Sequence, residues 1–156
     1  MKKALENKRG NSYVWLCVVV LVASMLFSVL FLYIELTSQI AAQRRDTKAK
    51  LDGYVSSYAV DAFEGLKHGT DYADYLDRQT FEDGVCPALG FPDETQETYE
   101  YPNGACTMTR PEVTVTFDNG YGVTIRYQVI LPVRWNGITF ADLTVPVTVS
   151  SYYKTK

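Results

Sequence analysis

An uncharged, strongly apolar run occupies residues 13–34 and is built mainly from Leu, Val, Phe and Met. It is long enough to cross the core of a bilayer as a helix, which takes about 20 residues. Tyr13, Trp15 and Tyr33 lie near its two ends, where aromatic rings favour the lipid–water interface. The run therefore predicts a transmembrane helix over residues 13–34, surrounded by membrane lipid.

The leader before this run, residues 1–12, is basic, with Lys2, Lys3, Lys8 and Arg9 against Glu6. The positive-inside rule then places the N-terminus in the cytoplasm and the rest of a single-pass protein outside the cell membrane. A cleaved signal peptide is the alternative, but its apolar core would be about 7–15 residues and end at a small-residue site. The only such site here, Ile40-Ala41-Ala42, lies well past the run, so we expect an uncleaved anchor.

Residues 35–68 predict an extracytoplasmic helix that continues the span. No Pro or Gly occurs between Asn11 and Asp52, and residues 39–50 are polar on most sides, which predicts a solvated neck. One helix from about Ser12 to Lys67 is the simplest arrangement, and a bend near Gly53 is the alternative. Apolar side chains recur at helical spacing beyond the neck, at Leu51, Val55, Tyr58, Ala59, Ala62, Phe63 and Leu66.

Residues 69–111 form an acidic region with irregular patterning and several Pro and Gly residues, which predicts loop. Cys86 and Cys106 fall in this exported part, where disulfides persist, and we predict that they pair. The bridge would close a loop of about 20 residues and contribute roughly 3 kcal/mol. The single His68 argues against zinc, and the acids Asp71, Asp74 and Asp77 are better explained as a solvated turn than as a calcium site.

Residues 112–156 alternate between apolar and Thr-rich positions, as expected for an antiparallel sheet with one solvated face. Turns are predicted at Asp118-Asn119-Gly120 and at Trp135-Asn136-Gly137-Ile138. Pro146 lacks an amide hydrogen, which places the last strand at an edge. The helix stripe and the apolar sheet face can bury each other, so the sequence predicts an α+β fold with the long N-terminal helix packed on this sheet.

Nothing in the sequence indicates catalysis, a cofactor, a metal or a small-molecule substrate, because no nucleophile–base, phosphate-binding or metalloprotease motif occurs. No basic stripe exists outside the leader, which excludes a nucleic-acid binder. Tyr99 and Tyr101 in the acidic region are candidate partner contacts, since tyrosine is enriched at interfaces. Ser24 and Ser28 have the small-xxx-small spacing that lets membrane helices approach closely.

Two stretches resemble the TadE-like minor pilins of Tad pilus systems, within the wider group of type IV pilins and pseudopilins. One is the sequence RGNSYVWL at residues 9–16, leading into the span. The other is the closing block of residues 123–153, where Val-, Thr- and Ile-rich strands flank a turn near Leu131-Pro132. The resemblance implies a structural subunit that assembles with other pilin-like subunits through its N-terminal helix.

The resemblance also implies leader processing between Gly10 and Asn11, but the fifth residue after Gly10 is Trp15, where such prepilins carry Glu. The nearest acid is Glu35, at the far end of the span. We therefore expect a membrane-resident accessory pilin or pseudopilin rather than a processed fibre subunit. The alternative hypothesis is a membrane-anchored extracytoplasmic protein-binding module unrelated to pili.

Overall fold

The computed structural model describes residues 3–67, 77–101, 104–117, 120–135 and 137–154. Only the backbone is described for residues 3–11, 61–62, 65–66 and 135. His68, Asp71 and Asp74 lie outside the described residues, as does most of the first predicted turn. The chain divides into two compact units, Met1–Ser38 and Gln39–Lys156, which are described separately below.

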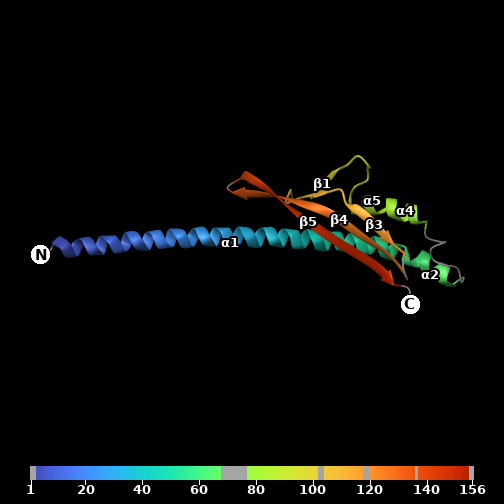
Figure 1. Ribbon diagram of the computed structural model, residues 1–156, viewed down its shortest axis with the longest axis horizontal. Coiled ribbons are helices and arrows are strands. Elements are labelled where there is room, and N and C mark those ends of the chain that lie inside the picture. The colour runs from blue at the N-terminus through green and yellow to red at the C-terminus, as the bar shows by residue number, and fades with distance from the viewer. Residues whose placement is uncertain (1–2, 68–76, 102–103, 118–119, 136, 155–156) are drawn as a thin grey trace. The chain divides into compact units, whose positions relative to one another are not determined.

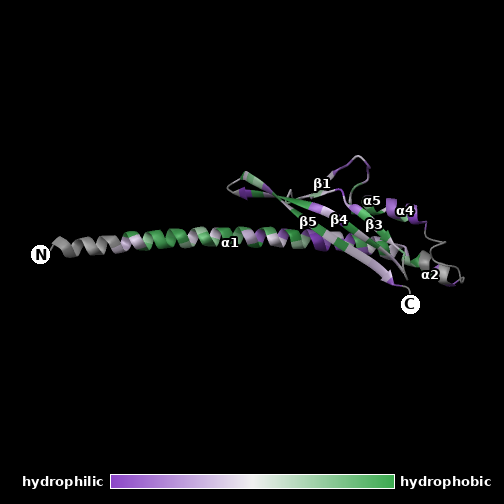
Figure 2. Ribbon diagram, viewed as in Figure 1, coloured by the Kyte–Doolittle hydropathy of each residue, from purple (hydrophilic) through white to green (hydrophobic). Residues whose placement is uncertain are grey.

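The first unit is helical. Helix α1, Lys3–Ser57, begins in it and continues into the second unit. It starts at Lys3 rather than near Ser12, because the leader contains Ala4, Leu5 and other good helix formers. Figure 2 shows that hydrophobic residues predominate along α1 in this unit beyond its first turns, and Trp15, Phe27 and Phe31 are each more than half exposed. By length and composition, this helix is apolar enough to serve as a membrane anchor or signal sequence.

The two membrane-helix serines are satisfied within α1. The Ser24 hydroxyl donates to the Leu21 carbonyl at 2.8 Å, and the Ser28 hydroxyl donates to the Ser24 carbonyl at 3.0 Å. Such back-bonding lets a hydroxyl lie in an apolar segment without an unpaired polar group.

Helix α1 is not interrupted at Gly53, where the alternative interpretation placed a boundary between two helices. α1 passes through Gly53 to Ser57, and the helix is interrupted at Tyr58, after which α2 covers Ala59–Lys67. The Ser57 hydroxyl donates to the Tyr54 carbonyl at 2.7 Å. In a continuous α-helix this carbonyl would accept from the Tyr58 amide, so the hydroxyl and the amide compete for it at the point where the helix is interrupted.

One antiparallel sheet dominates the second unit, and its described strands are β1 (Thr98–Glu100), β2 (Thr107–Thr109), β3 (Glu112–Thr116), β4 (Gly120–Trp135) and β5 (Ile138–Lys154). β2 and β3 follow one another along one edge of β4, and β1 pairs with β2. β5 pairs with β4 along its other edge, from Gly120↔Lys154 to Trp135↔Ile138. Within the described residues β5 has no second strand partner, which confirms the edge position predicted from Pro146.

The long β4–β5 hairpin turns between Trp135 and Ile138, and Gly137 in this turn has a positive φ of 81°. This confirms the second predicted turn, for which the Asn-Gly dipeptide is a strong signal. The predicted turn near Leu131-Pro132 is absent, so that prediction is wrong: β4 continues through Pro132, which pairs with Asp142. A proline is tolerated here because only β5 pairs with β4 beyond Ile130 among the described strands, so the second edge of this segment is open.

The hydrophobic core lies between one face of α1 and one face of the sheet, which confirms the α+β fold (Figure 1). Leu51 and Val55 are 1% and 3% exposed, and the Tyr121 hydroxyl donates to the Val55 carbonyl at 3.0 Å. The buried apolar side chains of β4 share one face, as a period of two requires, and they are Tyr121, Val123, Ile125, Tyr127, Val129 and Leu131. The predicted helix stripe does not extend fully into α2, where Phe63 is 65% exposed.

Residues 77–111 are more ordered than the expected loop. Two short helices, α4 (Arg78–Asp83) and α5 (Val85–Leu89), precede the β1–β2 hairpin. Asp77 caps α4 by accepting from the Gln79 amide at 3.2 Å. The apolar residues Phe81, Val85 and Leu89 are buried, so this region contributes its own part of the core.

The predicted Cys86–Cys106 disulfide is absent: both residues are buried free thiols. The loop is closed in another way. The Arg110 guanidinium donates to the backbone carbonyls of Asp93 at 2.8 Å and Glu94 at 3.0 Å. The backbone amide of Arg110 donates to the Glu97 carbonyl at 2.7 Å. These bonds and the β1–β2 ladder supply the constraint that the sequence interpretation assigned to a bridge.

Candidate functional site

The packed face of α1 begins with two polar residues, Gln43 and Thr47, which are 3% and 1% exposed. They precede Leu51 and Val55 at intervals of four residues, so all four lie on one helix face. The Gln43 amide nitrogen donates to the Thr47 hydroxyl at 3.0 Å, and the Gln43 carbonyl oxygen accepts from the Tyr127 hydroxyl at 3.1 Å. The stretch predicted to be a solvated neck is therefore part of the helix–sheet interface.

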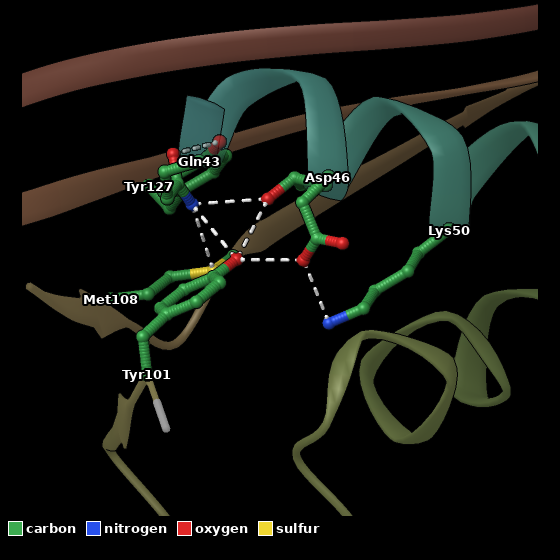
Figure 3. A network of polar contacts seen from close by, with 7 residues as sticks. Gln43, Asp46, Lys50, Tyr101, Met108 and Tyr127 are labelled. Atoms are coloured by element: carbon green, nitrogen blue, oxygen red, sulfur yellow. Dashed lines mark hydrogen bonds and ion pairs between the residues drawn. The ribbon is translucent and has the colours of Figure 1, made fainter. Parts of the chain in front are cut away.

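The β1–β2 hairpin joins this cluster through Tyr101 and Met108, as Figure 3 shows. The Tyr101 hydroxyl lies 3.4 Å from the Gln43 amide nitrogen and 3.3 Å from the Thr47 hydroxyl. The Met108 sulfur accepts from the same Gln43 nitrogen at 3.6 Å. Among the described residues, no buried side-chain nitrogen or oxygen is left without a hydrogen-bond partner, as buried polar groups require.

A charged pair borders the cluster on the solvent side. The Lys50 ammonium lies 3.0 Å from the Asp46 carboxylate, which also accepts from the Tyr101 hydroxyl at 3.4 Å. Lys50 lies above the rings of Tyr99 and Tyr101, at 5.7 and 5.6 Å from their centroids. This geometry permits cation–π attraction and holds both rings against α1.

These residues line a groove of about 480 Å³ between α1 and the β1–β2 hairpin. Its walls are Gln39, Ala42, Gln43, Asp46, Lys50, Tyr99, Tyr101, Ala105 and Cys106. The lining combines aromatic rings and two alanines with one ion pair. Its single carboxylate, that of Asp46, is engaged by Lys50.

Burial and pairing set the charge states in this groove. Burial alone would lower the pKa of Lys50, but its hydrogen bond to Asp46 and the charge of that carboxylate outweigh burial and raise the pKa. Burial raises the pKa of Tyr101 and Tyr127, so both hydroxyls stay protonated and can donate at neutral pH. Burial also raises the pKa of Cys106, which keeps this thiol in its unreactive, neutral form.

A second, smaller hollow of about 300 Å³ lies beside α4 and α5 and is lined in part by Cys86 and Arg110. Burial raises the pKa of Cys86, and the positive charge of Arg110 only partly offsets this effect. The two cysteines thus line different hollows. Among the described residues, no group of three His, Cys, Asp or Glu side chains is placed to hold a metal ion.

The two partner contacts predicted from the sequence, Tyr99 and Tyr101, are brought together. Tyr99 and Tyr101 pack edge to face, with ring centroids 5.4 Å apart, and both are half-buried under Lys50. Tyr101 therefore has a structural role as well as an exposed edge. Sequence reasoning missed Gln43 and Thr47. Their spacing of four residues from Leu51 and Val55 is the only sequence signal that places them on the packed face, and a stripe defined by apolar residues does not include them.

A long N-terminal helix that is apolar in its first part and packs in its later part on an antiparallel sheet is a pilin-like architecture. No protein-family model, curated protein or solved structure matches this chain.

Proposed function

We propose that this protein is a structural, single-span, pilin-like subunit, of the minor pilin or pseudopilin type, in a Tad-like pilus or secretion apparatus. The apolar part of α1 anchors it in the cell membrane, with the N-terminus in the cytoplasm and the second unit outside. The observation that carries the proposal is the exposed apolar surface of residues 13–34, which leads without a break into the helix that supports the sheet. An apolar helix stored in lipid can later pack against similar helices and shield the same surface.

Ser24 and Ser28 mark the face through which such helices would meet. They lie one turn apart on the same side of α1, and small side chains there let two backbones approach. Cross-linking in the membrane tests this role. In a Cys17→Ser background, Ser24→Cys or Ser28→Cys should form disulfide-linked dimers on mild oxidation. Leu26→Cys, on the opposite side of the helix, is the matched control.

Dimers at all three positions alike, or at none, would overturn helix-mediated assembly. Anchoring has its own test, because an integral membrane protein stays in the membrane fraction after extraction with alkaline carbonate. Mass spectrometry of the membrane-extracted chain tests processing: an intact Met1 would rule out the cleavage after Gly10 that the resemblance to prepilins implies.

The groove beside Tyr99, Tyr101 and Lys50 favours a second candidate function, a membrane-anchored binding module unrelated to pili. Gene neighbourhood separates the two. Adjacent genes for a secretion ATPase and a Tad-type membrane platform support the pilin-like role, and their absence would count strongly against it.

A further inference from the structure

The β4–β5 hairpin extends beyond the rest of the sheet as a two-stranded ribbon (Figure 1). β2 pairs with β4 as far as Ile130, and among the described strands only β5 accompanies residues 131–135. Residues 131–143 therefore depend on a single ladder that closes at Gly137. An isolated two-stranded hairpin is only marginally stable in water, so this ribbon lacks the support that the core gives the remaining strands.

Large apolar side chains are exposed on this ribbon. Ile138 is 61% exposed, Phe140 67% and Leu143 41%. Single exposed apolar residues are ordinary on a protein surface, but several on one unsupported ribbon mark an interaction surface. The ribbon also carries two exposed charged side chains, Arg134 on β4 and Asp142 on β5, so its net charge is zero and its exposed apolar side chains are what distinguish it.

Contacts within the second unit fix the direction of the ribbon. Tyr121 bonds the backbone of Val55, and Tyr127 bonds Gln43, so β4 runs antiparallel to α1. Past Tyr127, β4 therefore advances toward the Gln39 end of this unit. The eight residues from Tyr127 to the turn cover about 26 Å at a strand rise of about 3.3 Å. The four helical residues from Gln43 to Gln39 cover only about 6 Å.

The Gln39 end is also where the chain arrives from the apolar part of α1, which ends at Ile34. Five residue steps separate Ile34 from Gln39, and even a fully extended chain covers only about 18 Å in that number. The end of the unit toward which the ribbon projects is therefore tethered close to the bilayer surface. Because the chain itself links this end of the unit to the membrane helix, a lipid surface lies near the ribbon without the need for a second protein.

We propose that the tip of the β4–β5 hairpin is a second membrane contact that inserts Ile138 and Phe140 into the lipid–water interface of the anchoring membrane. This inference rests on the membrane anchoring in the proposed function. Apolar and aromatic side chains gain from burial at that interface, and the charged Arg134 and Asp142 can remain among the polar headgroups. The contact would add a second attachment point to the one that α1 provides.

Tryptophan quenching by brominated lipid tests the contact on the full chain, reconstituted in nanodiscs of phosphatidylcholine and phosphatidylglycerol. The chain has two tryptophans, Trp15 and Trp135, and replacing both with Phe gives a silent background. Phe140→Trp in that background reports on the tip. Tyr152→Trp is the matched control, since Tyr152 is an exposed aromatic residue near the other end of the same strand. We expect bromolipid to quench the Phe140→Trp emission and shift it to the blue, and to leave the Tyr152→Trp emission unchanged.

A Trp135→Phe variant that retains Trp15 reports on the anchor in the same discs. Absence of Trp15 quenching would refute the anchor and with it the proposed function. If bromolipid quenches Trp15, but Phe140→Trp and Tyr152→Trp give the same solvent-like emission, the hairpin contact alone is overturned. The Phe140→Trp emission could instead shift to the blue only in discs that hold two copies of the chain, without quenching by brominated lipid. That result would identify a second copy of the chain as the partner of the hairpin tip and would also overturn the proposal.

Discussion

The buried bond between Gln43 and Tyr127 can be tested by a double-mutant cycle of Gln43→Leu and Tyr127→Phe. The two side chains are 3% and 4% exposed, and the Tyr127 hydroxyl donates to the Gln43 carbonyl oxygen at 3.1 Å. Gln43→Leu leaves this hydroxyl buried without its acceptor, which costs about 1–3 kcal/mol. Burial of the Leu side chain recovers part of that cost, so we expect a net loss of about 1.5 kcal/mol in the free energy of unfolding.

Tyr127→Phe leaves the Gln43 carbonyl oxygen without its donor, and we expect a loss of about 1 kcal/mol. The double variant removes both partners, and replacing a buried hydrogen-bonded pair with apolar groups of similar shape can be nearly neutral. Thr47 and Tyr101 can still bond each other, because their hydroxyls lie 3.3 Å apart. We therefore expect the double variant to lose less than the sum of the single variants, with a coupling energy of about 1 kcal/mol or more.

Urea unfolding of the full chain in detergent micelles, followed by near-ultraviolet tyrosine circular dichroism, measures these differences in the second unit. With a slope of roughly 1–3 kcal/mol per molar urea, a loss of about 1.5 kcal/mol lowers the midpoint by about 0.5–1.5 M. Strict additivity of the two single losses would refute the reasoning, because it would mean that the two groups do not act as a bonded pair.

Three further outcomes follow from the same packing. Leu51→Ala should cost about 2–5 kcal/mol in the same unfolding assay, because Leu51 is 1% exposed. Cys86 and Cys106 should resist a thiol-reactive label in the folded chain and react fully in denaturant; failure to react in denaturant without a reductant would contradict free thiols. Burial would raise the pKa of Asp52, but the hydrogen bonds from Lys48 and Ser151 and the charge of Lys48 together outweigh burial and lower the pKa. Asp52 therefore stabilises the fold above about pH 4, and this contribution is lost as the pH falls through the folded-state pKa, so Asp52→Asn should weaken that acid dependence.

Periodicity was enough to predict the sheet, its solvated face and the α1 stripe at Leu51 and Val55, because both patterns arise from burying apolar side chains. It failed where polar groups hold the structure. The polar pattern predicts that Gln43 and Thr47 lie in a solvated neck. Burial of the Gln43 amide is stable only because distant residues such as Tyr127 complete its hydrogen bonds. No local pattern reveals those partners.

The acidic region shows the same limit. A long irregular connection needs a constraint, and the two cysteines were the obvious candidates. The structure instead uses Arg110, whose guanidinium binds the carbonyls of Asp93 and Glu94. Backbone carbonyls are not visible in a sequence, so a lone arginine gives no warning that it will organise a loop.

Polar contacts at the start of the packed helix face also explain how α1 keeps its position along the sheet. The packed face of α1 repeats at one-turn intervals, at Gln43, Thr47, Leu51 and Val55. If all four residues were apolar, the helix could slip along the sheet by one turn, about 5.4 Å, and still bury a similar area. The bond from Gln43 to Tyr127 exists in one register only. Specific buried polar pairs are known to select a register in helical assemblies, and we expect the same here.

The double variant Gln43→Leu/Tyr127→Phe should therefore keep much of its stability and lose its single register. Amide resonances of residues 43–55 should then appear doubled or broadened by exchange in nuclear magnetic resonance spectra of the full chain in micelles. Leu51→Ala is the matched control, because it is expected to be the less stable variant while leaving the Gln43–Tyr127 bond intact, and it should give one sharp set. A single sharp set from the double variant would show that the Gln43–Tyr127 bond is not what fixes the register of the sheet on the helix, and that the remaining contacts, such as the one from Tyr121 to Val55, are enough.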